Sequence, residues 1–271
     1  MLRERLAVTL LLVPPALWVI GRGGWLYLAG VSLLLGTAAA EYGLLFRRGG
    51  LRPAMGLLVG GAVLLAAGRQ LFDVKLQGLV LAVLLLAAMA WHELDFERGA
   101  PQSGTDFAVT VSGMLYLGWI GGYLVALRGL PEGEWWVLLT LPTVWLADSG
   151  AYFVGRAVGR RKLSPRLSPN KTWEGYLAGV VTGALAGAGL ALVWRVGAGP
   201  ASGLTPQLGA MLGAALGAIT PLGDLGISMF KRQMQVKDSG SLLTGHGGAL
   251  DRLDSWVWAG VLSYYLVSWL T

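Results

Sequence analysis

The chain has 271 residues, of which 55% are hydrophobic and 13% charged, and its formal net charge is +6. This composition excludes an ordinary soluble domain and a disordered chain, and it is typical of an integral membrane protein. Because the chain contains no cysteine, disulfides, thiolate metal sites and cysteine nucleophiles are excluded as well.

Apolar runs recur along the chain, and about 20 apolar residues suffice for a helix to cross the hydrocarbon layer of a membrane. Lipid leaves the backbone to satisfy its own hydrogen bonds, so each run should be helical. We therefore predict an all-α, polytopic membrane protein with about nine transmembrane helices. The predicted spans are 6–21, 25–42, 54–69, 76–91, 107–127, 134–155, 174–194, 207–228 and 254–270.

The first run has a basic start like that of a signal peptide, but residues 21–24 lead straight into a second apolar run. We interpret it as a retained first span rather than a cleaved signal. Sixteen of the 21 Lys and Arg residues fall in alternate segments that share a side with the N-terminus. This asymmetry predicts a cytoplasmic N-terminus and places the two long basic loops, 156–173 and 229–253, on the cytoplasmic side.

The seventh and eighth predicted spans carry glycines at four-residue spacing, which places each row on one helix face. Such rows let two helix backbones approach closely. We expect these two spans to pack together and to bring the two basic loops to one membrane surface. The rows are Gly175, Gly179, Gly183 and Gly187, and Gly209, Gly213 and Gly217.

Acidic side chains within the apolar runs are the first residues that indicate a functional site. Asp148 lies eight residues before Arg156, about 12 Å below the first basic loop. A carboxylate at that depth either has a function or forms a structural pair. Asp224, Ser228 and Lys231 share one helix face, which indicates a polar wall or a surface salt bridge. We expect Glu41 to reach the protein surface, although it could instead line the cavity that this polar wall would border.

The first basic loop ends in Ser168-Pro-Asn-Lys-Thr-Trp-Glu174. Here Lys171 stands where the seventh predicted helix begins, so its ammonium group and the helix amides can converge on an anion. Arginines 156, 160 and 161 are better explained as topology signals. The end of this loop therefore predicts half of a phosphate site.

The second basic loop combines cations, glycines and carboxylates. Lys231, Arg232, Lys237 and Arg252 can bind phosphates, and the glycines around His246 permit close backbone approach. The carboxylates of this loop form either ion pairs or ligands to a hard metal, and Mg²⁺ takes one or two carboxylates together with substrate phosphates. A zinc site is disfavoured because the chain has two histidines and no cysteine. No phosphate-binding P-loop motif occurs.

These segments resemble the signature of the CDP-diacylglycerol synthases, also called phosphatidate cytidylyltransferases. The resemblance runs unbroken over the 27 residues from Ser228 to Asp254 and includes Lys237-Asp238-Ser-Gly240, His246-Gly247-Gly248 and Asp251-Arg-Leu-Asp254. Residues 148–156 and 168–175 also resemble that family. Residues 1–140 match only as hydrophobic spans.

The resemblance implies transfer of CMP from CTP to phosphatidate, which gives CDP-diacylglycerol and pyrophosphate. It also implies a homodimer in the inner membrane that uses Mg²⁺, with room for a second cation, and that has no nucleic-acid partner. We treat 1–271 as one membrane domain, with N-terminal helices of unassigned role in 1–140 and the catalytic helices and cytoplasmic loops in 141–271.

Site roles follow from the chemistry of the residues and from this resemblance. The metal ligands implied by the resemblance are Asp224 and Asp251. Asp148, Lys171 and Asp254 are the expected catalytic residues. The expected substrate-binding residues are Ser168, Lys171, Ser228, Lys231, Arg232, Lys237, Asp238, His246, Gly247, Gly248 and Arg252.

Three other functions are compatible with parts of this pattern. A transporter or channel could use Asp148 and Asp224, but it would need polar residues across the whole bilayer, whereas the charges gather at one face. A polyprenyl or dolichol phosphotransferase or kinase shares the phosphate and Mg²⁺ chemistry, and nucleotide preference would separate it. A structural scaffold would not need the charged loops.

Overall fold

The computed structural model describes residues 13–200, 202–236, 239–240 and 248–271, and helices dominate this part of the chain. Residues 13–22 are helical and precede the named elements. The longer helices are α2 (Gly24–Arg48), α3 (Met55–Leu71), α4 (Val74–Glu97), α7 (Gly133–Val158), α8 (Trp173–Ala198), α9 (Pro206–Ile219), α10 (Pro221–Gln233) and α11 (Leu250–Leu270). Shorter elements are α5 (Ser103–Gly113), the π-helix η1 (Met114–Ile120), α6 (Tyr123–Arg128), β1 (Lys162–Ser164) and β2 (Ser168–Thr172).

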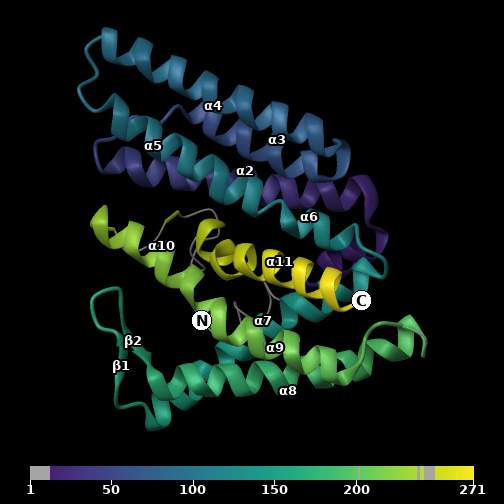
Figure 1. Ribbon diagram of the computed structural model, residues 1–271. Helices are drawn as coiled ribbons and strands as arrows, with labels where there is room; N and C mark the ends of the chain where they lie inside the picture. The colour runs from purple at the N-terminus through teal and green to yellow at the C-terminus, as the bar shows by residue number, and fades with distance from the viewer. Residues whose placement is uncertain (1–12, 201, 237–238, 241–247) are drawn as a thin grey trace.

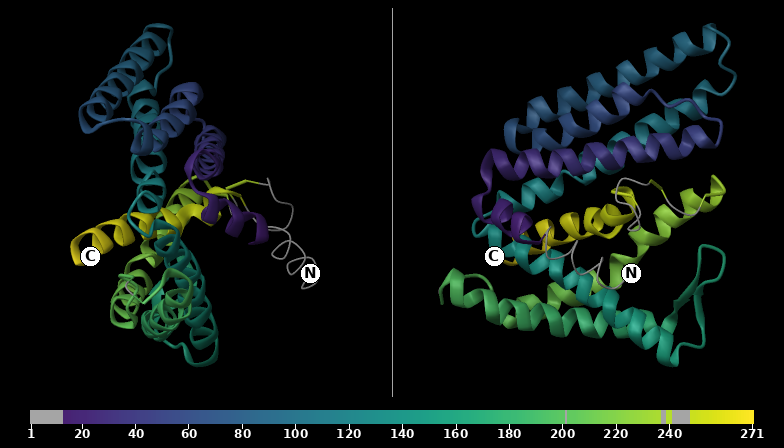
Figure 2. Two further views of the ribbon diagram at one scale, coloured as in Figure 1. Left: turned by 90° about the vertical axis from the view of Figure 1, so that its right-hand side faces the viewer. Right: turned by 180° about the vertical axis from the view of Figure 1, so that it is seen from behind.

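The helices form a layered bundle with α11 inside it. Figures 1 and 2 show α3, α4 and α5 along one edge, α8 and α9 along the other, and α10 and α11 between them. Helix α11 contacts α2, α6, α7, α9 and α10, so it joins the N-terminal helices to the C-terminal ones. The β1–β2 hairpin, α10 and the first turn of α11 lie at the same end of the bundle (Figure 1).

The predicted count of nine spans is not confirmed, because six helical segments of the described chain are long and apolar enough to cross a membrane. Helix α3 has 17 residues and falls short of that length. Helix α11 matches the predicted ninth span but is not among the six, because its sequence includes charged and polar side chains. The first predicted span lies partly outside the described residues. The prediction of an all-α membrane protein is confirmed, without the count of spans. The six segments are Gly24–Arg48, Val74–Glu97, Ser103–Arg128, Gly133–Val158, Trp173–Ala198 and Pro206–Gln233.

The glycine rows pack α8 against α9 as predicted. A Cβ atom at Gly213 would meet the carbonyl oxygen of Gly183, and one at Gly187 would meet the carbonyl oxygen of Gly209. The two backbones therefore touch without intervening side chains. This contact holds α10, which continues from α9, beside the loop that precedes α8.

Two local features differ from the prediction. The eighth predicted span is two helices, because α9 ends at Ile219 and α10 begins at Pro221. Proline has no backbone N–H and cannot continue the hydrogen-bond ladder of the preceding helix. The first basic loop folds into an antiparallel hairpin in which Lys162 pairs with Thr172 and Ser164 with Ser168.

Candidate active site

The β1–β2 hairpin is fixed to the start of α8 and presents Lys171 toward α10. Thr172 accepts a hydrogen bond from the backbone N–H of Gly175 at 3.2 Å and so caps α8. The Glu174 carboxylate accepts bonds from the backbone N–H groups of Arg160 and Arg161 at 3.0 and 3.2 Å. The Lys171 Nζ atom then lies 2.6 Å from Asp224 Oδ2. The predicted meeting of the two basic loops is confirmed by a separate contact, in which Arg232 Nε of the second loop lies 3.4 Å from the Leu167 carbonyl oxygen of the first.

Three carboxylates from three helices interact with one another beside this lysine. Asp148 comes from α7, Asp224 from α10 and Asp254 from the first turn of α11. Asp148 interacts electrostatically with Lys171 and Asp224, and Asp254 interacts with both other aspartates. The Asp148 side chain is exposed, whereas Asp254 is buried. Carboxylates that lie close together repel one another when ionised, so a bound cation would stabilise the ionised form of this group.

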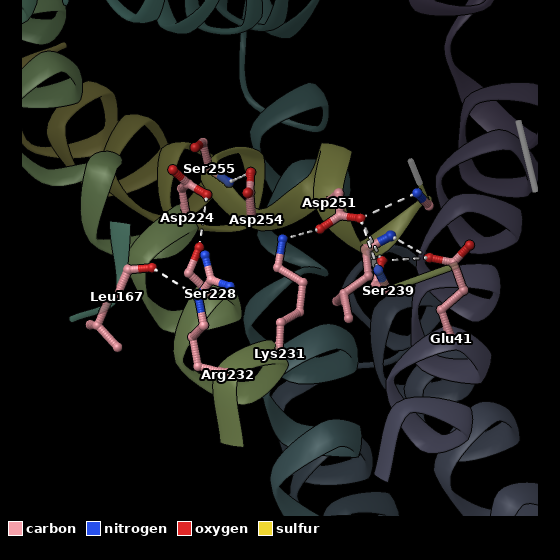
Figure 3. Close-up of polar contacts among 12 residues, drawn as sticks. Glu41, Leu167, Asp224, Ser228, Lys231, Arg232, Ser239, Asp251, Asp254 and Ser255 are labelled. Atoms are coloured by element: carbon pink, nitrogen blue, oxygen red, sulfur yellow. Dashed lines mark hydrogen bonds and ion pairs between the residues drawn. The ribbon is translucent and has the colours of Figure 1, made fainter. Parts of the chain in front are cut away.

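A second group of polar residues is centred on Asp251, one helical turn from Asp254. Lys231 Nζ lies 2.6 Å from Asp251 Oδ1. The other carboxylate oxygen accepts hydrogen bonds from the Ser239 backbone N–H at 3.2 Å, from Ser239 Oγ at 2.8 Å and from the Gly248 N–H at 3.3 Å (Figure 3). Burial raises the pKa of Asp251, but Lys231 and Ser239 outweigh it and hold that pKa below its ordinary value. Asp251 is therefore an ionised anchor for this group.

The two metal ligands implied by the resemblance stand in separate groups, Asp224 with Lys171 and Asp251 with Lys231. Within the described ranges, no three His, Asp or Glu side chains are arranged to hold a metal ion. Mg²⁺ commonly completes its coordination with waters and with phosphate oxygens of a substrate.

The remaining predicted residues lie around these groups. Ser228 Oγ is 3.5 Å from Asp224 Oδ1, and Arg232 Nε lies 3.4 Å from the Leu167 carbonyl oxygen of the hairpin (Figure 3). Ser168 begins β2 and is half-buried, and Arg252 is on the exposed side of the first turn of α11. Four predicted residues lie outside the described chain: Lys237, Asp238, His246 and Gly247.

Sequence reasoning missed the position of Glu41. It was expected to reach the surface, but its side chain is 6% exposed and contacts the second polar group. The helix face that carries it also carries Ala38, Tyr42 and Leu45, which are all buried. A carboxylate on the buried face of an apolar helix was the signal that could have found it.

Comparison of the sequence with known proteins shows the family of this chain. A sequence profile described as the Cytidylyltransferase family matches residues 3–270. Phosphatidate cytidylyltransferase of Pseudomonas aeruginosa is 38% identical over 273 residues, which cover 94% of this chain and 93% of the relative. The protein of that name from Synechocystis is 34% identical, covering 90% and 89%, and the one from Haemophilus influenzae is 47% identical over 46% and 42%. The chain belongs to the cytidylyltransferase family.

Proposed function

We propose that the protein is a phosphatidate cytidylyltransferase, which transfers CMP from CTP to phosphatidate and releases pyrophosphate. The observation that carries this proposal is the convergence of Lys171 and Lys231, from the two basic loops, with the carboxylates of Asp224 and Asp251 at one end of a membrane bundle. Relatives of that name along nine-tenths of the chain support it. The same convergence disfavours an ion channel, which would need polar groups along the whole bilayer.

In the reaction, an oxygen of the phosphatidate phosphate attacks the α-phosphorus of CTP. The new P–O bond forms as the bond from the α-phosphorus to the bridging oxygen breaks, and pyrophosphate carries away the electron pair. The second pKa of a phosphate monoester is about 6, so the attacking oxygen is already largely ionised at neutral pH. The residues therefore need to hold two anions together and neutralise developing charge, rather than remove a proton.

The cations of both groups would meet the phosphates. Lys171 and Lys231 would exchange their carboxylate partners for phosphate oxygens. Arg232 lies beside Lys231 on α10, and Arg252 lies beside Asp251 on α11. The Gly248 amide would add a backbone donor. We assign Asp148 and Asp254 to orienting these groups, and Ser168, Ser228 and the predicted residues outside the described chain to substrate binding.

We also propose that the enzyme uses Mg²⁺. A cation would relieve the repulsion among the carboxylates of Asp148, Asp224 and Asp254, and Asp224 and Asp251 would hold it together with phosphate oxygens. The bound ion would supply positive charge that polarises the transferring phosphoryl group. Removal of divalent cations with EDTA should stop pyrophosphate release, and added Mg²⁺ should restore it. Full activity in EDTA would contradict this assignment.

The site should face the cytoplasm from the inner membrane. There, phosphatidate can keep its acyl chains in lipid while CTP arrives from water. The distribution of Lys and Arg supports this orientation. The resemblance further leads us to propose a homodimer, which the mass of the detergent-solubilised protein would test.

The deciding experiment incubates the purified protein with phosphatidate and each of CTP, ATP, GTP and UTP, and measures pyrophosphate. We expect release with CTP alone. The Asp224→Asn variant should lose this activity yet keep its thermal midpoint. Asp73→Asn is its control, because Asp73 caps α4 away from the site and asparagine caps helices equally well. Absence of release with CTP would overturn the proposed function.

A further inference from the structure

Glu41 belongs to α2, yet its carboxylate lies among residues of the C-terminal signature. The Oε2 atom accepts a hydrogen bond from the Leu250 backbone N–H at 2.9 Å and lies 3.4 Å from Ser239 Oγ (Figure 3). These partners stand 209 and 198 residues away along the chain. A buried carboxylate is costly unless it is well partnered, and Leu250 and Ser239 provide the partners here.

The bond to Leu250 supplies a cap that α11 lacks. The first N–H groups of a helix have no partner within it. Ala249 stands at the N-cap position and provides no side-chain acceptor, so Glu41 accepts in its place. Negative charge is also favourable at a helix N-terminus. The turn held in this way carries Asp251 and Asp254.

Two glycines of the signature close around the same carboxylate. A Cβ atom at Gly240 would meet Glu41 Oε1, and one at Gly248 would meet Glu41 Oε2 and Ser239 Oγ. Neither glycine has a positive φ angle, so lack of space explains them better than backbone conformation. Among the described residues, Oε1 has no hydrogen-bond partner. Glu41 thus fits tightly against the chain on both sides of segment 241–247.

The Ser239 hydroxyl links Glu41 to Asp251. Its one proton is shared between two acceptors, Asp251 Oδ2 at 2.8 Å and the more distant Glu41 Oε2 at 3.4 Å. A displacement of Glu41 would therefore move both the Ser239 donor and the Leu250 amide. Both changes act on Asp251, whose other oxygen pairs with Lys231.

We propose that Glu41 is a positioning residue, which holds the first turn of α11 and Ser239 so that Asp251 and Lys231 keep their places in the site. Its effect on turnover rests on the proposed function. Its effect on the geometry of α11 does not. The N-terminal helices thereby contribute to the site through one side chain.

The test compares Glu41→Gln with Asp106→Asn. Asp106 is also buried in the N-terminal helices and accepts a backbone bond from Arg52 N–H at 2.6 Å, but it is not part of either polar group of the site. Removing a residue that orients the groups of a site typically lowers activity by about 10- to 100-fold. We expect such a fall in kcat for Glu41→Gln, with the KM for CTP nearly unchanged. Asp106→Asn should lower the thermal midpoint at most, with kcat unaltered.

Hydrogen exchange over residues 248–254, measured by mass spectrometry, separates this proposal from the proposed function. Glu41→Gln should speed exchange there, and Asp106→Asn should not. If the wild-type protein releases no pyrophosphate from CTP, the proposed function fails, and exchange still decides the role of Glu41. Unchanged exchange in Glu41→Gln, or a wild-type kcat in an active enzyme, would overturn the role.

Glu41→Asp provides a second variant should Glu41→Gln not fold. It keeps the charge and shortens the side chain by one methylene, so the carboxylate no longer reaches the Leu250 amide. The same fall in kcat and the same faster exchange are expected. Wild-type exchange in this variant would overturn the proposal.

Discussion

Lys171 and Asp224 form an ion pair 2.6 Å long that joins the β1–β2 hairpin to α10. Their side chains are 27% and 35% exposed, so water screens the pair in part. Pairs of this kind contribute about 0 to 1 kcal/mol to stability. Folding alone therefore gives little reason for Lys171 to stand here. A phosphate ligand that replaces Asp224 as the partner of Lys171 gives a better reason for its position.

Replacing Lys171 with methionine should consequently damage activity far more than stability. Loss of one charge-stabilising donor typically costs about 100- to 1000-fold in kcat. The thermal midpoint should move by no more than about 4 °C, the shift that about 1 kcal/mol produces in a chain of this size. Pyrophosphate release with CTP and phosphatidate, measured beside thermal unfolding in detergent, provides both values.

Glu134→Gln is the matched control for Lys171→Met. Glu134 pairs with Arg128 at 3.3 Å, and these side chains are 37% and 20% exposed, close to the values for the Lys171 pair. This pair lies at the start of α7, whereas the site lies near its other end. The control should keep full activity. Equal activity in the two variants would mean that Lys171 is only structural.

The sequence predicted the membrane class and the packing of α8 on α9, because each depends on local spacing. The roles assigned to residues of the two basic loops stay predictions. Glycines four residues apart share a helix face whatever the rest of the chain does. Lys171 could be placed at a helix start for the same reason. Local spacing did not predict that Asp224 pairs with Lys171 or that Asp251 pairs with Lys231, because the two residues of each pair lie on different elements.

The contact of Glu41 could not be predicted in this way. Its position depends on how α2 docks against the start of α11, some 200 residues later, and a helical pattern gives a buried face without naming what covers it. The break at Thr220 and Pro221 was visible as a proline, but the apolar residues on both sides suggested one continuous span. Tertiary docking decided the contact of Glu41, whereas the local chemistry of Pro221 decided the break.

Gly248→Ala should impair the enzyme, because the added methyl group meets Glu41 Oε2 and Ser239 Oγ. Overpacking of a tight site costs about 1 to 3 kcal/mol, and here the strain falls on the donors of Asp251. We expect kcat to fall at least about tenfold. Gly60→Ala is the control, since nothing lies within 4 Å of a Cβ at Gly60. Normal turnover in Gly248→Ala would show that the contact is relaxed in solution.

Gly213→Ala tests the contact between α8 and α9. The methyl group would meet the Gly183 carbonyl oxygen, so the helices must separate. A cost of about 1 to 3 kcal/mol corresponds to a fall of about 2 to 12 °C in the thermal midpoint. Gly189→Ala, on α8 with open space around its Cβ, should leave the midpoint unchanged. Equal midpoints for the two variants would argue against backbone contact at Gly213.

The orientation of the site can be tested because the natural chain has no cysteine. Single cysteines at Arg166, in the exposed turn of the hairpin, and at Pro200, just beyond α8, would be the labelling sites. Helix α8 has 26 residues and is about 39 Å long, more than the roughly 30 Å of hydrocarbon, so these positions should lie on opposite sides of the membrane. The excess of Lys and Arg around the hairpin predicts that Arg166 is cytoplasmic. A membrane-impermeant maleimide should therefore label Pro200→Cys in intact spheroplasts and Arg166→Cys only in inverted vesicles. The opposite pattern would place the phosphate site on the outer face, where CTP is not supplied, and labelling of both variants in spheroplasts would show that α8 does not cross the membrane.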